Sequence, residues 1–235
     1  MMQLPTATIR TQVELPLRFA DGYVADARVF SFDGLVDGRE HLAFALGDRT
    51  APIPADGRHV PLIRPHSECL TGDVFGSERC DCGPQLREAV ERIAEAGGYL
   101  LYLRQEGRGI GLYSKLDAYA LQDAGADTYE ANLALGHGED ERSYLAAAQM
   151  LHALGASRIA LLSNNPDKVR QLRSWGVTVV EQVPTGVYVS DANRRYLETK
   201  AGRGRHTLDL SSVLLSGRTR SGNGSGSGSR ARPAP

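Results

Sequence analysis

The sequence GGYLLYLRQEGRGIG, residues 97–111, contains the pattern that decides the fold class. Its residues 99–103 form a short, almost continuous apolar run, which is typical of a strand buried on both faces. Before it, residues 85–96 place apolar side chains at helical spacing and end at Gly97 and Gly98. After it, residues 114–124 predict a second helix that ends at Gly125. This stretch therefore indicates a strand between two helices.

The same alternation continues towards the carboxyl end. We expect a helix over residues 141–154, a strand over 158–162, a helix over 166–175 that begins with Pro166, and a strand over 177–180. The first 60 residues favour strands at 13–19, 23–30 and 41–45, separated by Asp-Gly turn signals. The sequence thus predicts an α/β fold (mixed α+β): a β-rich N-terminal layer followed by alternating strands and helices with a partly parallel sheet.

Composition and charge narrow the class of protein. The chain has 235 residues and a net charge of −1, and its last 20 residues carry four arginines and no acid, which leaves the remainder at −5. We expect a catalytic domain over residues 1–215, a disordered Gly/Ser/Arg-rich tail over 216–235, and no nucleic-acid partner. No apolar run is long enough to cross a membrane and no signal peptide is evident, so we expect a cytoplasmic protein without a membrane partner.

Three cysteines, Cys69, Cys80 and Cys82, fall within 14 residues. An odd number is a poor disulfide framework, whereas three thiolates with an open fourth position are typical of catalytic zinc. A water at that position would have its pKa lowered towards neutrality. Two alternatives stay open: three buried thiols that bind no metal, and a structural zinc site that His66 completes.

Three charged loops are candidates for binding a ligand, in particular a phosphate. The loop that contains Glu106, Gly107 and Arg108 follows the predicted strand, where α/β sheets bind ligands, and its arginine can fork onto a phosphate. Residues 138–142 precede a predicted helix, and their acids could equally serve the helix dipole. Residues 163–168 join a strand to a helix start that suits a phosphate, although an Asn-Pro turn with a helix cap explains them as well.

Taken together, these segments resemble the GTP cyclohydrolase II family. The matching runs are RPHSECLTGD (64–73), RCDCG (79–83), RQEGR (104–108), AYALQD (118–123), DER (140–142), NNP (164–166) and YLETK (196–200). Their order and spacing match that family from about residue 10 to 206. The resemblance implies zinc-dependent hydrolysis of GTP to 2,5-diamino-6-(ribosylamino)-4(3H)-pyrimidinone 5′-phosphate, formate and pyrophosphate, the first step of riboflavin biosynthesis. It also implies magnesium on the substrate phosphates and a homodimer.

The resemblance also implies roles for individual residues. Zinc ligands would be Cys69, Cys80 and Cys82. The proton acceptor would be Asp140, the nucleophile on the α-phosphate Arg142, and the residue that completes ring opening Tyr119. Contacts to GTP would come from Arg64, Pro65, His66, Ser67, Glu68, Gln85, Glu106, Gly107, Arg108, Thr128, Ser163 and Lys168.

The roles of two residues, Arg142 and Pro65, have alternative interpretations. A guanidinium is protonated and has no free lone pair, so Arg142 could instead clamp the α-phosphate. Pro65 lacks an N–H that could contact phosphate.

The chain could also be a paralogue that releases a formamidopyrimidine nucleotide without formate, or a zinc-stabilised nucleotide-binding module without turnover. It is too short for the additional domain of about 200 residues found in bifunctional relatives, so we expect only the cyclohydrolase activity.

Overall fold

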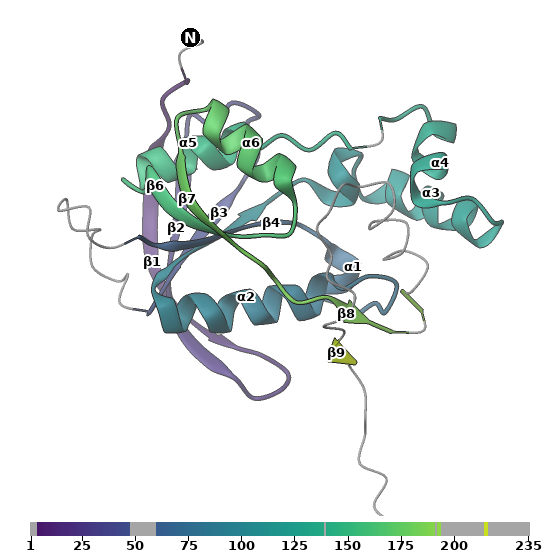
Figure 1. The fold of residues 1–235 in the computed structure, drawn as a ribbon, viewed down its shortest axis with the longest axis horizontal. Helices are drawn as coiled ribbons and strands as arrows, with labels where there is room; N and C mark the ends of the chain where they lie inside the picture. Colours follow the sequence, from purple (N-terminus) through teal and green to yellow (C-terminus); the bar gives the residue numbers. More distant parts are fainter. Residues whose placement is uncertain (1–3, 48–59, 139, 191, 194–213, 216–235) are drawn as a thin grey trace, which may run out of the picture.

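The computed structural model describes residues 4–47, 60–138, 140–190, 192–193 and 214–215, and the side chains of 128–129 and 214–215 lie outside that description. A seven-stranded mixed sheet, in the order β1-β2-β3-β5-β4-β6-β7, forms its centre (Figure 1). The strands are β1 (Thr8–Arg18), β2 (Val24–Asp33), β3 (Leu42–Leu46), β4 (Leu62–Ser67), β5 (Gly98–Leu103), β6 (Arg158–Leu162) and β7 (Thr178–Val183). Strands β1, β2, β3 and β5 pair antiparallel, whereas β5, β4, β6 and β7 pair parallel.

Helices cover both faces of this sheet. Helix α2 (Cys82–Ala96) lies along one face, while α5 (Leu145–Ala153) and α6 (Pro166–Ser174) lie on the other (Figure 1). Helices α3 (Leu112–Asp123) and α4 (Thr128–Ala134) extend beyond the end of the sheet, where the short α1 (Leu70–Asp73) also lies. A short 3-10 helix, η2 (Glu106–Gly109), follows β5, and β8 (Tyr188–Val189) pairs parallel with β9 (Leu214–Leu215).

The period of two along each strand separates two cores. Leu62 and Leu100 pack with Val90 and Ile93 of α2. Their strand neighbours belong to the core on the opposite face, with α5 and α6: Ile63, Leu101, Leu161, Leu151 and Leu172. Because β4 and β5 carry apolar side chains on both faces, they are central strands.

The predicted α/β class with a partly parallel sheet is confirmed, and β6 has the predicted bounds. The three N-terminal strands form the antiparallel half of the same sheet. The helix predicted over 85–96 begins earlier, at Cys82. Among the described residues, no helix is both long and apolar enough to cross a bilayer. The predicted tail and the YLETK run (196–200) lie outside the described residues.

The predicted start of the helix at residue 141 is wrong, since α5 begins at Leu145. The backbone N–H of Glu141 donates to the carbonyl of Arg108 at 3.0 Å, and that of Arg142 donates to Asp140 Oδ1 at 3.2 Å. These bonds hold the segment as a loop against η2. The N–H groups of Glu141 and Arg142 are therefore bonded to partners outside α5.

Strand β4 was not predicted, although it lies at the centre of the parallel half. Pro65 stands within it, and proline normally argues against a central strand. Its carbonyl points to the β6 side, where it accepts Lys168 Nζ at 2.7 Å, and the pairing with β6 ends at Ile63. In a parallel strand the N and C=O of one residue face the same side. The missing N–H of Pro65 therefore removes no ladder hydrogen bond.

Candidate active site

A cavity of about 150 Å³ opens at the carboxyl ends of β4, β5 and β6. The chain runs from β4 to β5 on one side and then returns to β6 on the other, so this is the switch point where open α/β sheets bind ligands. Most of the predicted site residues line it: Arg64, His66, Ser67, Glu68, Cys69, Cys80, Cys82, Gln85, Glu106, Gly107, Arg108, Tyr119, Arg142, Ser163 and Lys168.

Three predicted residues do not line the cavity as described. Pro65 contributes its carbonyl to Lys168. Asp140 contacts the cavity through Arg142, whose Nε donates to Asp140 Oδ1 at 2.8 Å. Thr128 is the first residue of α4, and its side chain lies outside the described part of the chain.

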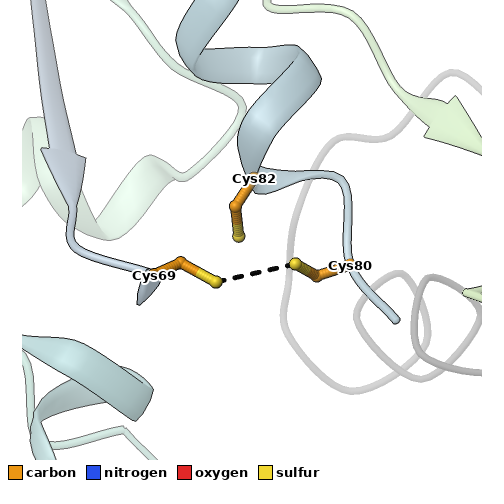
Figure 2. A group of neighbouring side chains, drawn as sticks. All are labelled: Cys69, Cys80 and Cys82. Carbon is orange, nitrogen blue, oxygen red and sulfur yellow. Dashed lines mark hydrogen bonds between the residues drawn. The ribbon is translucent and has the colours of Figure 1, made fainter. Parts of the chain in front are cut away.

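The three thiols converge from different elements (Figure 2). Cys69 follows β4, Cys80 lies in the loop before α2, and Cys82 is the first residue of α2. Their Sγ atoms lie within 4.8 Å of one another, and those of Cys69 and Cys80 are 3.6 Å apart. A disulfide needs about 2 Å. Two sulfurs bound tetrahedrally to one zinc, each at about 2.3 Å, lie about 3.8 Å apart. The spacing therefore fits a zinc ion.

Gly72 of α1 makes room for this cluster. A Cβ at that position would lie 2.7 Å from Cys80 Sγ and 3.1 Å from Cys69 Sγ, closer than atoms in contact approach. The helix can thus pass directly over the sulfur atoms only because residue 72 has no side chain.

His66 is not part of the thiol cluster. Its Nε2 lies 3.1 Å from both carboxylate oxygens of Asp73, and burial lowers the pKa of this imidazole. Asp73 Oδ2 also accepts the Cys69 N–H at 3.0 Å and the Tyr102 hydroxyl at 2.9 Å. The buried Asp73 carboxylate, which the sequence reasoning did not single out, therefore joins His66 to the loop that carries Cys69.

The thiols differ in their readiness to ionise. Hydrogen bonds from Cys80 and Cys82 lower the pKa of Cys69, and Lys115 lowers it further. The bond to Cys69 raises the pKa of Cys80 to about 11, and the pKa of Cys82 is raised as well because it donates to the same sulfur. The Cys69 thiol is thus the one that ionises most readily, and the Lys115 ammonium lies beside its sulfur.

Lys115 is a second residue that the sequence reasoning missed. It lies on α3, one helical turn before Tyr119, and its Nζ is 3.1 Å from Cys69 Sγ and 2.7 Å from Glu106 Oε1. Glu106 Oε1 also accepts the Gly107 N–H at 3.0 Å, and its Oε2 accepts the Leu70 N–H at 2.6 Å. Three donors from the protein therefore orient the Glu106 carboxylate.

Cationic side chains gather on the other wall of the cavity. Arg64 is fully buried, donates to the Leu162 carbonyl at 3.1 Å and to Gln85 Oε1 at 2.8 Å, and has its pKa lowered by burial. Lys168 lies in the first turn of α6, where Asn165 Oδ1 caps the helix by accepting the Asp167 N–H at 2.9 Å. Free N–H groups and a cation at a helix start favour an anion.

Arg108 and Arg142 complete this cationic wall. Arg108 has a φ of +62°, next to Gly107 at +61°, a left-handed conformation that a side chain other than glycine adopts only at a cost in energy. This strained turn directs η2 at the cavity. Arg142 forks onto the Asp140 carboxylate; burial raises the pKa of Asp140, but the bonds from Arg142 lower it more, so the net shift is downward. Both members of the pair are therefore charged at neutral pH.

Tyr119 faces the thiols from α3. Burial raises the pKa of its phenol to about 12, so the hydroxyl stays protonated and can donate a hydrogen bond. The guanidinium of Arg79 lies 4.3 Å from the ring centroid and also pairs with Asp123. The ring is thus held between the cavity and a cation.

The remaining lining residues are polar apart from Ile110 and Ala118, and the family resemblance assigned none of them an individual role: Asp81, Ile110, Ala118, Gln122, Asn132, Asn164, Asn165 and Thr185. The side chain of Asn164 bonds both backbone groups of Thr185, at 2.8 and 3.1 Å. It thereby fixes the segment after β7 at the edge of the cavity.

Comparison with known proteins agrees with this geometry. A family model described as GTP cyclohydrolase II matches residues 10–184. The chain is 52% identical to the GTP cyclohydrolase-2 of Vibrio cholerae over 187 residues, 79% of this chain and 91% of that protein. It is 48% identical to the GTP cyclohydrolase-2 of Aliivibrio fischeri over 199 residues, 84% and 96% of the two chains. It is also 53% identical over 182 residues to the riboflavin biosynthesis protein RibBA of Bacillus velezensis, 77% of this chain and 44% of that protein.

Proposed function

Since the chain belongs to the GTP cyclohydrolase II family, we propose that it hydrolyses GTP to 2,5-diamino-6-(ribosylamino)-4(3H)-pyrimidinone 5′-phosphate, formate and pyrophosphate. The observation that carries this proposal is the arrangement of one cavity, with a trio of thiols on one wall and a cluster of cations on the other. A nucleoside triphosphate has a base to present to the first wall and a polyanion to present to the second.

The thiols would hold zinc. The sulfur spacing and the space left by Gly72 support this assignment. When bound, zinc supplies Lewis-acid chemistry that makes water nucleophilic near neutral pH. The wall that carries Cys69 also carries Glu106, whose fixed carboxylate would orient the guanine so that C8 faces the metal site. Addition of water at C8 opens the imidazole ring, and a second hydrolysis releases formate.

The cationic wall would bind the triphosphate. Arg64, Arg108 and Lys168 would neutralise its charge, and the family resemblance implies that Mg²⁺ would contribute further positive charge. For Arg142 the fork onto Asp140 favours a clamp on the α-phosphate, because a charged guanidinium has no lone pair with which to attack. Asp140 would accept a proton when water cleaves the bond that releases pyrophosphate, and Tyr119 would donate a hydrogen bond during ring opening.

The family resemblance also supplies the proposed domain bounds, oligomeric state, cellular location and pathway. The catalytic domain would span residues 1–215, act as a homodimer in the cytoplasm and feed riboflavin synthesis; the relative from Bacillus velezensis is named for that pathway.

Removal of the metal tests the zinc assignment. The protein, treated with a chelator and dialysed, should keep its far-UV circular dichroism and lose GTP turnover, and Zn²⁺ should restore turnover while Mg²⁺ alone should not. Cys80→Ser should be folded and inactive whether or not zinc is added. Turnover that persists without zinc would contradict a catalytic metal, and loss of the fold on chelation would favour a structural zinc and the binding-module alternative.

A further inference from the structure

The ammonium of Lys115 is saturated with acceptors inside the protein. Its Nζ lies 2.7 Å from Glu106 Oε1, 3.0 Å from Thr71 Oγ1 and 3.1 Å from Cys69 Sγ, and the side chain is only 10% exposed. An ammonium has three N–H donors, so each acceptor can receive one. Lys115 therefore has no donor to spare for a ligand, although it lines the cavity.

The composition of the chain shows that lysine at this position is unusual. Of the 27 basic residues 24 are arginine, and the lysines are Lys115, Lys168 and Lys200. The two that the structure describes, Lys115 and Lys168, both line the cavity. A planar guanidinium could not place three donors around one point, whereas a compact ammonium can. An ammonium therefore fits the three acceptors around residue 115 better than a guanidinium would.

Lys115 joins two groups of the site that come from different segments. Cys69 Sγ and the Glu106 carboxylate are both buried, and both accept a hydrogen bond from the same ammonium. We propose that Lys115 is a positioning residue that fixes the metal-binding sulfur of Cys69 relative to the base-orienting carboxylate of Glu106, an inference that rests on the proposed function. It acts through those two groups and touches neither substrate nor reacting atoms.

Metal binding gives the most direct test, because it needs no GTP. Zinc affinity would be measured by competition with a chromophoric chelator for the wild type, Lys115→Met and Lys115→Arg. We expect both variants to bind zinc on the order of 10–100-fold more weakly, the range found for residues that orient metal ligands. In the Co²⁺-loaded protein, the sulfur-to-cobalt charge-transfer band of Lys115→Met should move to longer wavelength, because the sulfur loses a hydrogen bond from a cation. Arg10→Met, which removes one exposed charge on the edge strand β1, should match the wild type.

A charge-balanced variant separates positioning from simple damage to the fold. In Lys115→Met the Glu106 carboxylate would stay buried without its cation. The double variant Lys115→Met/Glu106→Gln should therefore bind zinc about fivefold more tightly than Lys115→Met alone. Thr71→Val, which removes only one of the three acceptors, should lower zinc affinity less than Lys115→Met does.

The proposal would be overturned if Lys115→Met bound zinc within twofold of the wild type with an unshifted cobalt band, or if the double variant were no better than the single one. A failure of the proposed function would look different. In that case the wild type would not consume GTP, while the differences in zinc affinity among these variants would remain.

Discussion

Gly72→Ala is the substitution for which the structure gives the clearest magnitude. The added Cβ would lie 2.7 Å from Cys80 Sγ, and ordinary contact requires about 3.7 Å, so one of the two atoms must move by about 1 Å. Metal–ligand distances tolerate only about 0.2 Å. A misplacement of about 1 Å costs on the order of 100-fold in a site that depends on geometry. We therefore expect zinc affinity and GTP turnover each to fall by about 100-fold.

The metal-free protein should behave differently, because a cysteine side chain that binds no metal can rotate its sulfur away from the added Cβ. Gly72 is not among the glycines with positive φ, and alanine is favoured over glycine in a helix by about 0.5–1 kcal/mol. The melting temperature of metal-free Gly72→Ala should thus stay within about 4 °C of the wild type. Gly138→Ala is a matched control, because its Cβ would meet only the flexible side chain of Glu141, with Cγ at 3.4 Å and Oε1 at 3.7 Å. Normal zinc affinity in Gly72→Ala, measured by chelator competition, would refute the proposed packing of α1 over the thiols.

Three further outcomes can be checked separately. Tyr119→Phe should still consume GTP but release less formate, and mass spectrometry should detect a nucleotide that retains the formyl group; full formate release would exclude a role for the hydroxyl. In Asp73→Asn the amide oxygen can still accept from the Cys69 N–H and the Tyr102 hydroxyl, but the amide N–H takes the place of the oxygen next to His66 Nε2; loss of that charged acceptor should cost about 1–3 kcal/mol and lower the melting temperature by about 2–10 °C. Because Arg142 holds the pKa of Asp140 below its ordinary 3.8, the pair stabilises the fold above that pH and the effect is lost as pH falls through the lowered pKa. The melting temperature of Asp140→Asn should therefore be lower than that of the wild type at pH 7 and equal to it near pH 2. A difference in melting temperature that does not change with pH would contradict a stabilising ion pair.

The sequence predicted most of the parallel half of the fold, because its apolar patterns are strong. The strand at 158–162 and the helix that begins at Pro166 follow directly from periodicity and proline placement. Strand β4 was missed because Pro65 and the polar residues around it lack a strand pattern. Only the pairing partners show that the proline faces the side where the ladder with β6 has already ended.

The residues of the candidate site were identified from local patterns of the same kind. The cysteines and the charged loops carry recognisable spacing and family motifs, and the cavity brings most of them together. Lys115 and Asp73 were missed because each looks, in the sequence, like an ordinary charged residue exposed to solvent. Their importance comes from contacts across the fold, to Cys69 and Glu106 or to His66 and Tyr102. The scarcity of lysine in an arginine-rich chain was the one sequence signal that could have pointed to Lys115.

The central claim concerns the products. Purified protein would be incubated with GTP, Zn²⁺ and Mg²⁺, and formate, pyrophosphate and the nucleotide product would be quantified by mass spectrometry. We expect formate and pyrophosphate in equal amounts together with the diaminopyrimidinone phosphate. Pyrophosphate with a retained formyl group, or no consumption of GTP, would contradict the account.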